Sequence, residues 1–153
     1  MIYLLPGTFD PPTLGHLDMI IRAKELVETL LVGVAHNPAK KPLFTVEERI
    51  EMLRALAPKV EVVAIDGLLV DFAKKRGVTA FIRGMRNLSD YEKEGQRAFA
   101  NLKIGGIETL FIHTNPLYAH ISSSLLREVA QNHHTITDFV PSSIADKVLA
   151  RLT

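Results

Sequence analysis

The sequence lacks several features that would place it in particular classes of protein. Its 153 residues include no cysteine, which excludes a disulfide framework and a thiolate-bound metal site. It has no apolar run of the roughly 20 residues that a transmembrane helix needs. Its 18 basic residues are nearly matched by 17 acidic ones, so it lacks the basic excess of proteins that coat nucleic acid.

The beginning of the chain also lacks the basic stretch that opens a signal peptide. We therefore expect a cytoplasmic protein with no nucleic-acid partner and no membrane partner. The sequence contains no repeat, low-complexity tract or Gly/Ser-rich linker, and its length suits one core, so we expect a single domain over residues 1–153. With a net charge of only +1, any bound anion must be held by particular Lys, Arg and His side chains.

Short apolar runs rich in β-branched residues alternate with segments of helical period, as in βα units that build a parallel sheet. The expected strands are Ile2–Pro6, Leu30–Ala35, Val60–Ile65, Ala80–Arg83 and Thr109–His113. The expected helices cover 15–28, 46–56, 68–76, 89–103, 123–132 and 142–152, with capping boxes at Thr45/Glu48 and Ser89/Glu92. This order predicts an α/β fold: a doubly wound, Rossmann-like, five-stranded parallel sheet with helices on both faces.

In such a sheet, ligands bind outside the carboxyl ends of the strands, near the point where the strand order reverses. After the first expected strand, Gly7 to His16 read GTFDPPTLGH and run directly into a helix. The two glycines permit close backbone approach, and the helix N-terminus attracts anions. His16 would lie at this helix start, although a single histidine there is more often a surface residue.

Three other loops follow expected strands and carry side chains suited to phosphate. Residues 37–45 read NPAKKPLFT and hold two lysines, which on a loop are usually solvated. Residues 82–87 read IRGMRN, and arginine meets phosphate with paired donors, although one of the two arginines could be a surface ion-pair residue. Residues 118–128 read YAHISSSLLRE, in which three serines offer hydroxyls and free amides at a helix start, one of them as a cap.

Together these four segments resemble the phosphopantetheine adenylyltransferases of the nucleotidylyltransferase superfamily. GTFDPPTLGH is similar to the TxGH form of the superfamily's HxGH motif, with Thr13 where many members have the first histidine. NPAKKPLF, IRGMR and ISSSLLRE are similar to three further segments of the family, so the resemblance spans almost the whole chain. It implies transfer of AMP from ATP to 4′-phosphopantetheine, which gives dephospho-coenzyme A and pyrophosphate in coenzyme A biosynthesis.

The resemblance also implies roles for individual residues. It makes His16, Lys40 and Thr8 catalytic, with Thr8 and Lys40 also holding the acceptor. It places Arg83 on the acceptor phosphate and Leu69 and Val70 beside the pantetheine arm. The residues that it places around ATP are Thr8, Phe9, His16, Gly84, Met85, Arg86, Glu94, Tyr118, Ala119, His120, Ile121, Ser122, Ser123 and Ser124. His120 occupies a variable position and is given no catalytic role, and Lys93 stands beside Glu94 where the family often has an aromatic residue.

No pair of histidines has H-x-x-x-H spacing beside a carboxylate, so we expect no metal site built from protein ligands. Mg²⁺ should arrive bound to the phosphate oxygens of ATP. The resemblance further implies a homohexamer and coenzyme A as a feedback ligand.

Two alternatives stay open at this point. One is another adenylyl- or cytidylyltransferase, with nicotinamide mononucleotide or glycerol 3-phosphate as its acceptor. It predicts an RTxGIST-like string on the carboxyl side, and residues 117–122 lack the arginine and threonine of that string. The other is a regulatory module that binds a nucleotide without chemistry, which would be expected to have lost His16 or Lys40.

Overall fold

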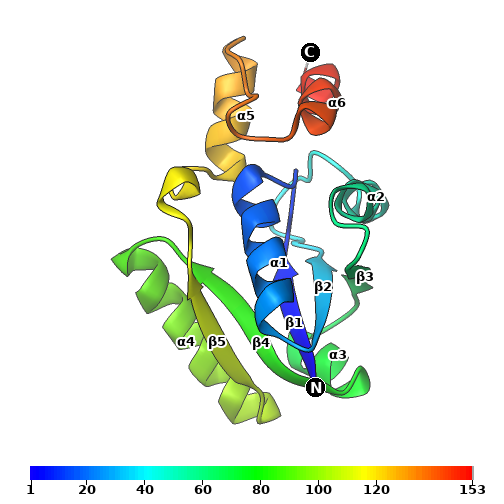
Figure 1. Ribbon diagram of the computed structural model, residues 1–153, viewed down its shortest axis with the longest axis vertical. Helices are drawn as coiled ribbons and strands as arrows, with labels where there is room; N and C mark the ends of the chain where they lie inside the picture. The colour runs from blue at the N-terminus through cyan, green and yellow to red at the C-terminus, as the bar shows by residue number, and fades with distance from the viewer. Residues whose placement is uncertain (153) are drawn as a thin grey trace.

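A computed structural model describes residues 1–152 and contains a five-stranded parallel sheet between helices (Figure 1). The strands are β1 (Ile2–Gly7), β2 (Thr29–Ala35), β3 (Glu61–Ile65), β4 (Val78–Met85) and β5 (Glu108–His113). Their order is β3-β2-β1-β4-β5, and every neighbouring pair is parallel. The predicted doubly wound sheet is therefore confirmed, with its reversal of strand order between β1 and β4.

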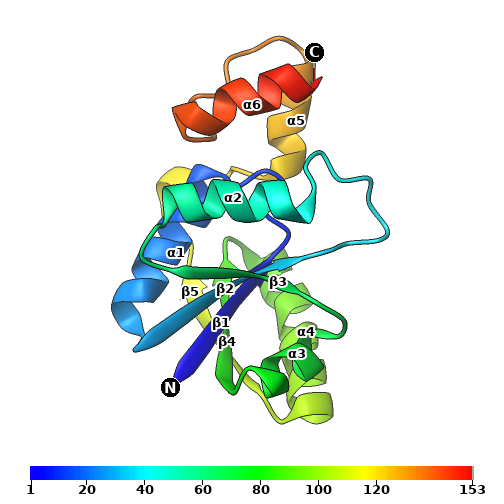
Figure 2. The ribbon, with the colours of Figure 1, turned by 90° about the vertical axis from the view of Figure 1, so that its right-hand side faces the viewer.

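Helices cover both faces of the sheet. They are α1 (Leu14–Leu26), α2 (Val46–Leu56), α3 (Leu69–Lys75), α4 (Leu88–Gly105), α5 (Ser123–Gln131) and α6 (Ser142–Leu152), with a short 3₁₀ helix, η1 (Pro116–Tyr118). Figures 1 and 2 show α1 and α2 on one face and α3 and α4 on the other. Within residues 1–152, no helix combines the length and the apolar character needed to span a bilayer.

The central strand β1 explains why the first expected strand reads as continuously apolar. Successive side chains of a strand point to opposite faces of its sheet. Leu5 packs into the core formed with α1 and α2, which includes Ile20 and Leu53. Leu4 packs into the core of the other face, which includes Val70 of α3 and Phe81 of β4. Because both faces of β1 are covered, polar residues are absent until the strand ends.

A third apolar core lies beyond the carboxyl ends of the strands. It joins Phe44 and Met52 to Leu126 of α5 and to Ile144 and Val148 of α6. In Figures 1 and 2, α5 and α6 form a layer next to α2, above the end of the sheet at which β1 finishes. This layer brings the N-terminus of α5 over the edge where a doubly wound sheet binds its ligands.

Two details of the predicted elements differ from the structure. The capping box at Thr45 and Glu48 is confirmed, but the one at Ser89 and Glu92 is wrong. Helix α4 begins one residue earlier, because the Asn87 side chain accepts a hydrogen bond from the Asp90 amide at 3.0 Å and so caps the helix instead. Strand β4 also extends two residues beyond each end of the predicted range 80–83, which puts Gly84 and Met85 on the strand.

Candidate active site

A cavity of about 440 Å³ lies at the carboxyl ends of β1 and β4, where the strand order reverses. All four segments singled out in the sequence reach it. The expected residues that line this cavity are Thr8, Phe9, His16, Lys40, Arg83, Gly84, Arg86, Glu94, Tyr118, Ile121, Ser122, Ser123 and Ser124. Its size lies within the range of small-molecule sites in proteins, about 300 to 1,000 Å³.

A second cavity of about 380 Å³ adjoins the first. The two share the lining residues Pro6, Gly7, Thr8, Arg83 and Glu94. Leu69 lines the second cavity, as do the apolar residues Ile65 and Phe81 and the amide-bearing Asn101. Arg83 and Thr8 therefore stand where a group held in one cavity would meet a group held in the other.

Four of the expected residues lie outside these two cavities. Met85 and Ala119 line a third hollow together with Arg22 and His113, which shares Arg86 and Thr114 with the first cavity. His120 is exposed, and its ring contacts the ring of Phe139, with centroids 5.9 Å apart. Val70 is only 1% exposed and belongs to the core between α3 and the sheet, so it presents no surface to a ligand.

His16 is held as a neutral imidazole by its place at the start of α1. Its Nδ1 accepts a hydrogen bond from the Thr13 amide at 3.0 Å, while its own amide donates to Thr13 Oγ1, so the two residues form a capping box. An accepting Nδ1 leaves the ring proton on Nε2. Burial, followed by the positive charges of Arg86 and Arg83, lowers the pKa of His16 to about 4. At neutral pH the ring is therefore an uncharged donor on the wall of the cavity.

Arg83 is fixed in the shared wall by a bidentate ion pair with Glu94. Its Nε and Nη2 donate to the two carboxylate oxygens at 2.8 Å each, and its Nη1 donates to the carbonyl of Pro6. Burial alone would raise the pKa of Glu94, but the hydrogen bonds and charge of Arg83 outweigh it and leave that pKa lowered. The pair therefore holds both charges in place before any ligand binds.

Arg86 connects the end of β4 to the serine segment. Its Nε donates to Asp90 at 3.1 Å, and its Nη1 donates to the carbonyl of Ile121, also at 3.1 Å. Ser122 caps α5 by accepting from the Leu125 amide, so it is the serine expected to act as a cap. The cavity thus receives a guanidinium and the N-terminus of α5 on the same side, which suits phosphate oxygens.

The loop between β1 and α1 has a constrained shape. Phe9 has a φ of 52°, in the left-handed region that residues other than glycine rarely adopt, and its side chain is buried. Its ring meets the His16 ring edge to face, with centroids 4.9 Å apart. A Cβ at Gly7 would lie 2.8 Å from this ring, so only glycine fits there. Backbone strain of this kind is typical of functional sites.

Several residues of the site were not predicted. Asp10 and Arg49 are buried beneath it, Asp90 lines the first cavity, and Arg97 and Asn101 line the second. Asp10 carried only a turn signal in the sequence, because Asp followed by proline is typical of turns, which are usually exposed. The residues on α4 carried no such signal, since polar residues one turn apart are typical of any solvent-facing helix.

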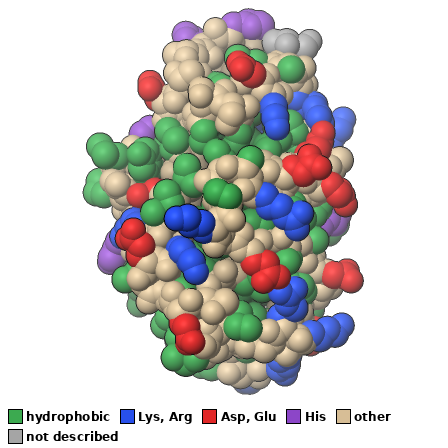
Figure 3. Space-filling model, turned by 45° about the vertical axis from the view of Figure 1, so that its right-hand side comes forward, with side chains coloured by type: hydrophobic (Ala, Val, Ile, Leu, Met, Phe, Trp, Pro, Cys, Tyr) green, Lys and Arg blue, Asp and Glu red, His purple; other side chains and the backbone are tan. Residues whose placement is uncertain are grey.

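The charges of the site are local. On the face drawn in Figure 3, Lys and Arg side chains are interspersed with Asp and Glu and form no patch of one sign. In the part of the chain that the structure describes, no group of three or more His, Asp or Glu residues is arranged to hold a metal ion. The two carboxylates that line the first cavity, Asp90 and Glu94, are already paired with Arg86 and Arg83.

Comparison with known proteins identifies a family. The model of the family described as cytidylyltransferase-like matches residues 4–129. A phosphopantetheine adenylyltransferase from Caldanaerobacter subterraneus subsp. tengcongensis is 44% identical over 154 residues, covering 98% of this chain and 96% of that protein.

Solved structures share the fold at lower identity. A protein assigned as a nicotinate-nucleotide adenylyltransferase from Vibrio parahaemolyticus matches with a TM-score of 0.64 and 14% identity, over 99% of this chain and 96% of that one. A lipopolysaccharide core biosynthesis protein from Thermoplasma volcanium matches with a TM-score of 0.58 and 21% identity, over 75% of this chain and 96% of that one.

The lowered pKa of His16 predicts how its ring titrates in the ligand-free protein. Because the pKa falls from 6.5 to about 4 on folding, the unfolded chain binds the proton more readily between these values. The contribution of His16 to stability is thus fully present above pH 6.5 and is lost as the pH falls toward 4. NMR of ring-labelled histidine should give a midpoint near 4 for His16 and a protonated Nε2 at pH 7. A midpoint near 6.5 would contradict the burial argument.

Proposed function

The chain belongs to the phosphopantetheine adenylyltransferase family within the cytidylyltransferase-like proteins, and from this premise we propose how its two cavities divide the reaction. The enzyme transfers AMP from ATP to 4′-phosphopantetheine and so forms dephospho-coenzyme A and pyrophosphate. One observation carries the proposal: His16, Lys40 and Arg83 line a single cavity, and Arg83 also lines the next one.

The first cavity would take the triphosphate of ATP and the second would take the acceptor. The second suits the pantetheine arm, because its lining combines apolar side chains such as Leu69 and Ile65 with the amide of Asn101. A guanidinium has five N–H groups. Arg83 uses two on Glu94 and one on Pro6, which leaves two for the acceptor phosphate. Arg83 can therefore orient the phosphate without breaking the ion pair that positions it.

The reaction itself would be an in-line attack. An oxygen of the acceptor phosphate forms a bond to the α-phosphorus of ATP while the bond to the pyrophosphate oxygen breaks. A phosphate anion is already a nucleophile, so no general base is required. The enzyme must instead position the two groups and stabilise the charge that develops on the transferred phosphoryl group.

Residues of the first cavity are suited to that task. The Nε2–H of His16 and the ammonium of Lys40 would donate to oxygens of the α-phosphate, and Thr8 would hold the two phosphates together. The N-terminus of α5, with Ser122 to Ser124, would bind the β- and γ-phosphates, with Arg86 beside them. A neutral His16 donor gives up no proton, so its contribution should persist over a wide pH range.

Mg²⁺ would be carried by the nucleotide. The carboxylates beside the first cavity are engaged by arginines, so the donor set suits a cation that keeps its waters and binds phosphate oxygens. When bound there, Mg²⁺ would neutralise charge on the triphosphate. The chain's own residues would position that triphosphate, through α5 and Arg86.

The proposed ligands extend to the products. Coenzyme A and dephospho-coenzyme A both contain the pantetheine arm that we place in the second cavity, so both should compete with 4′-phosphopantetheine. Coenzyme A would then be a feedback ligand. We place the enzyme in the cytoplasm, where ATP is available and where a chain without cysteine needs no oxidising compartment.

The outer face of α4 supports the proposed homohexamer. Leu88, Tyr91, Phe99 and Leu102 follow one another at spacings of three, eight and three residues, which places them on one face of the helix. They are between 39% and 77% exposed, and Leu110 on edge strand β5 is 44% exposed. An apolar stripe of this length at the edge of a sheet is typical of a surface covered by another subunit.

Removing the imidazole of His16 tests its proposed role. His16→Ala should lower kcat by on the order of 10² to 10³, the loss expected for one preorganised donor, with a smaller effect on the KM values. Pyrophosphate release from ATP, measured with 4′-phosphopantetheine and with nicotinamide mononucleotide, gives both the rate and the acceptor. His134→Ala, which removes an exposed imidazole that does not line the cavity, is the matched control. Turnover by His16→Ala close to that of the control would remove His16 from the mechanism.

Placing a charge on the α4 stripe tests the homohexamer. In sedimentation velocity, the wild-type protein should have about six times the 17.0 kDa mass of the chain. Phe99→Glu should shift it to smaller species, because a carboxylate buried between subunits has no partner. Ile21→Glu changes a residue on α1 that is 50% exposed and should leave the mass unchanged. A wild-type mass of one chain would contradict the proposal.

A further inference from the structure

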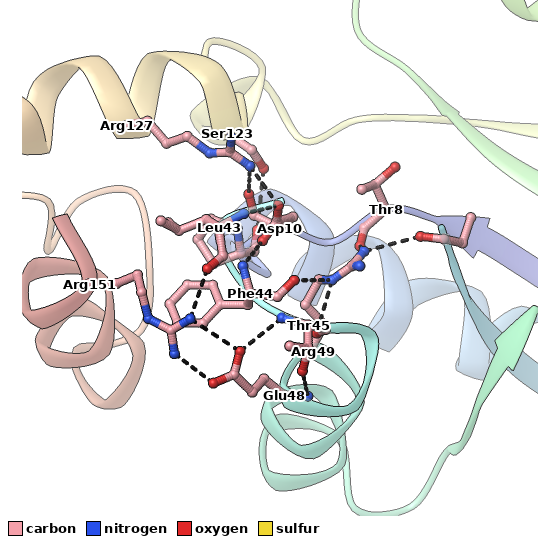
Figure 4. A network of polar contacts seen from close by, with 12 residues as sticks. Thr8, Asp10, Leu43, Phe44, Thr45, Glu48, Arg49, Ser123, Arg127 and Arg151 are labelled. Carbon is pink, nitrogen blue, oxygen red and sulfur yellow. Dashed lines mark hydrogen bonds and ion pairs between the residues drawn. The ribbon is translucent and has the colours of Figure 1, made fainter. Parts of the chain in front are cut away.

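The carboxylate of Asp10 lies beneath the first cavity, and nothing in the proposed chemistry uses it. It is only 3% exposed. Oδ2 accepts a hydrogen bond from the Leu43 amide at 2.7 Å, and Oδ1 accepts one from the Phe44 amide at 2.8 Å (Figure 4). One short side chain from the loop after β1 therefore holds the chain just after Lys40, across more than 30 positions of sequence.

Two arginines bind the backbone around Asp10, and one of them, Arg127, also binds its carboxylate. Arg127 of α5 donates through Nη2 to both Oδ2 and the backbone carbonyl of Asp10, at 2.7 Å each. Arg49 of α2, which is 1% exposed, donates to the carbonyls of Thr8 at 2.7 Å and Ala35 at 3.0 Å. It also donates to the carbonyls of Phe44 and Thr45. Figure 4 shows these groups converging from separate elements.

The segment that carries Lys40 depends on these contacts for its position. Residues 38–42 are all exposed, and the local bonds near Lys40 reach only Asn37. Before this segment, the Ala35 carbonyl is held by Arg49, and after it the Leu43 and Phe44 amides are held by Asp10. Arg49 also binds the Thr8 carbonyl, and Asp10 belongs to the same loop as Thr8. Both contacts therefore connect the Lys40 segment to this loop, which sets the position of Lys40 relative to Thr8 and His16.

We infer that Asp10 is a positioning residue: supported by Arg127, it fixes the Lys40 segment against the loop that presents Thr8 and His16. The inference rests on the proposed function, since it concerns the placement of Lys40 for transfer. Because Arg127 belongs to α5, its bonds to Asp10 also position this helix, whose N-terminus carries the serines. Asp10 would thus set the distance between three groups that meet the triphosphate, without touching the substrate itself.

Asp10→Asn is the direct test. The amide keeps the size of the side chain, but its NH₂ group must face one of the two backbone N–H groups or Arg127, so a donor meets a donor. We expect kcat for pyrophosphate release to fall by about 10- to 100-fold, as a displacement near 1 Å can cause, while the KM for ATP changes by less than about threefold. Thermal melting of each variant sets an assay temperature at which all are folded.

A double-mutant cycle separates positioning from a general loss of structure. Lys40→Ala is made in the wild-type protein and in Asp10→Asn. The quantity compared is the fold loss of kcat caused by Lys40→Ala. If Asp10 acts through Lys40, this loss should be at least about tenfold smaller in the Asp10→Asn background than in the wild type. Glu61→Gln is the control, because it removes the carboxylate of an ion pair with Arg76 on another part of the molecule. In the Glu61→Gln background, Lys40→Ala should lower kcat by the same factor as in the wild type.

Arg127 provides a second route if Asp10→Asn does not fold. Arg127→Gln removes the charge but leaves the amides of Leu43 and Phe44 bonded to Asp10, so it should lower kcat less than Asp10→Asn does. As with Asp10→Asn, the fold loss of kcat caused by Lys40→Ala should be smaller in this background than in the wild type. Arg127→Lys keeps a charged donor and should restore most of that loss.

The outcomes are distinct. A wild-type protein that releases no pyrophosphate with 4′-phosphopantetheine would overturn the proposed function, and this inference with it. An active wild type in which the Asp10 and Lys40 effects simply multiply, or in which Asp10→Asn retains the wild-type kcat, would overturn the positioning role alone.

Discussion

The structure depends on one constraint, the reversal of strand order between β1 and β4. The chain leaves β1 toward the face of α1 and leaves β4 toward the face of α4, so no helix closes the gap between the two strand ends. Both proposed binding cavities open there, on either side of Arg83. A parallel sheet with a different order would still bury Leu4 and Leu5, but it would not place the loop of Thr8 beside the guanidinium of Arg83.

Within this gap, carboxylates hold the cationic groups in place before a ligand arrives. Glu94 fixes Arg83, Asp90 fixes Arg86, and Asp10 fixes both Arg127 and the segment that follows Lys40. Such pairing explains how a chain with a net charge of +1 can present several positive groups to a triphosphate. It also reduces the reorganisation that binding would otherwise require, which is how fixed donors stabilise a transition state.

The sheet and the ligand edge could be predicted from the sequence, because the apolar strands and the loops that follow them are local patterns. The neutral state of His16 could not, since it depends on the Thr13 amide and on burial that the fold creates. The same holds for Glu94: the resemblance placed it near the nucleotide, and only the structure shows that its carboxylate is held by Arg83. Val70 was misplaced because a helical apolar residue can face either a ligand or the core, and Gly105 of α4 packs against it.

The central claim is that the acceptor phosphate attacks the α-phosphorus of ATP directly, because the two cavities meet at Arg83 and Thr8. The stereochemistry of the transfer tests this most directly. With ATP made chiral at the α-phosphorus by sulfur substitution, a single in-line displacement inverts the configuration in the dephospho-coenzyme A product. The account predicts inversion. Retention would show two successive displacements through a covalent adenylyl-enzyme, and would contradict the direct meeting of the two substrates.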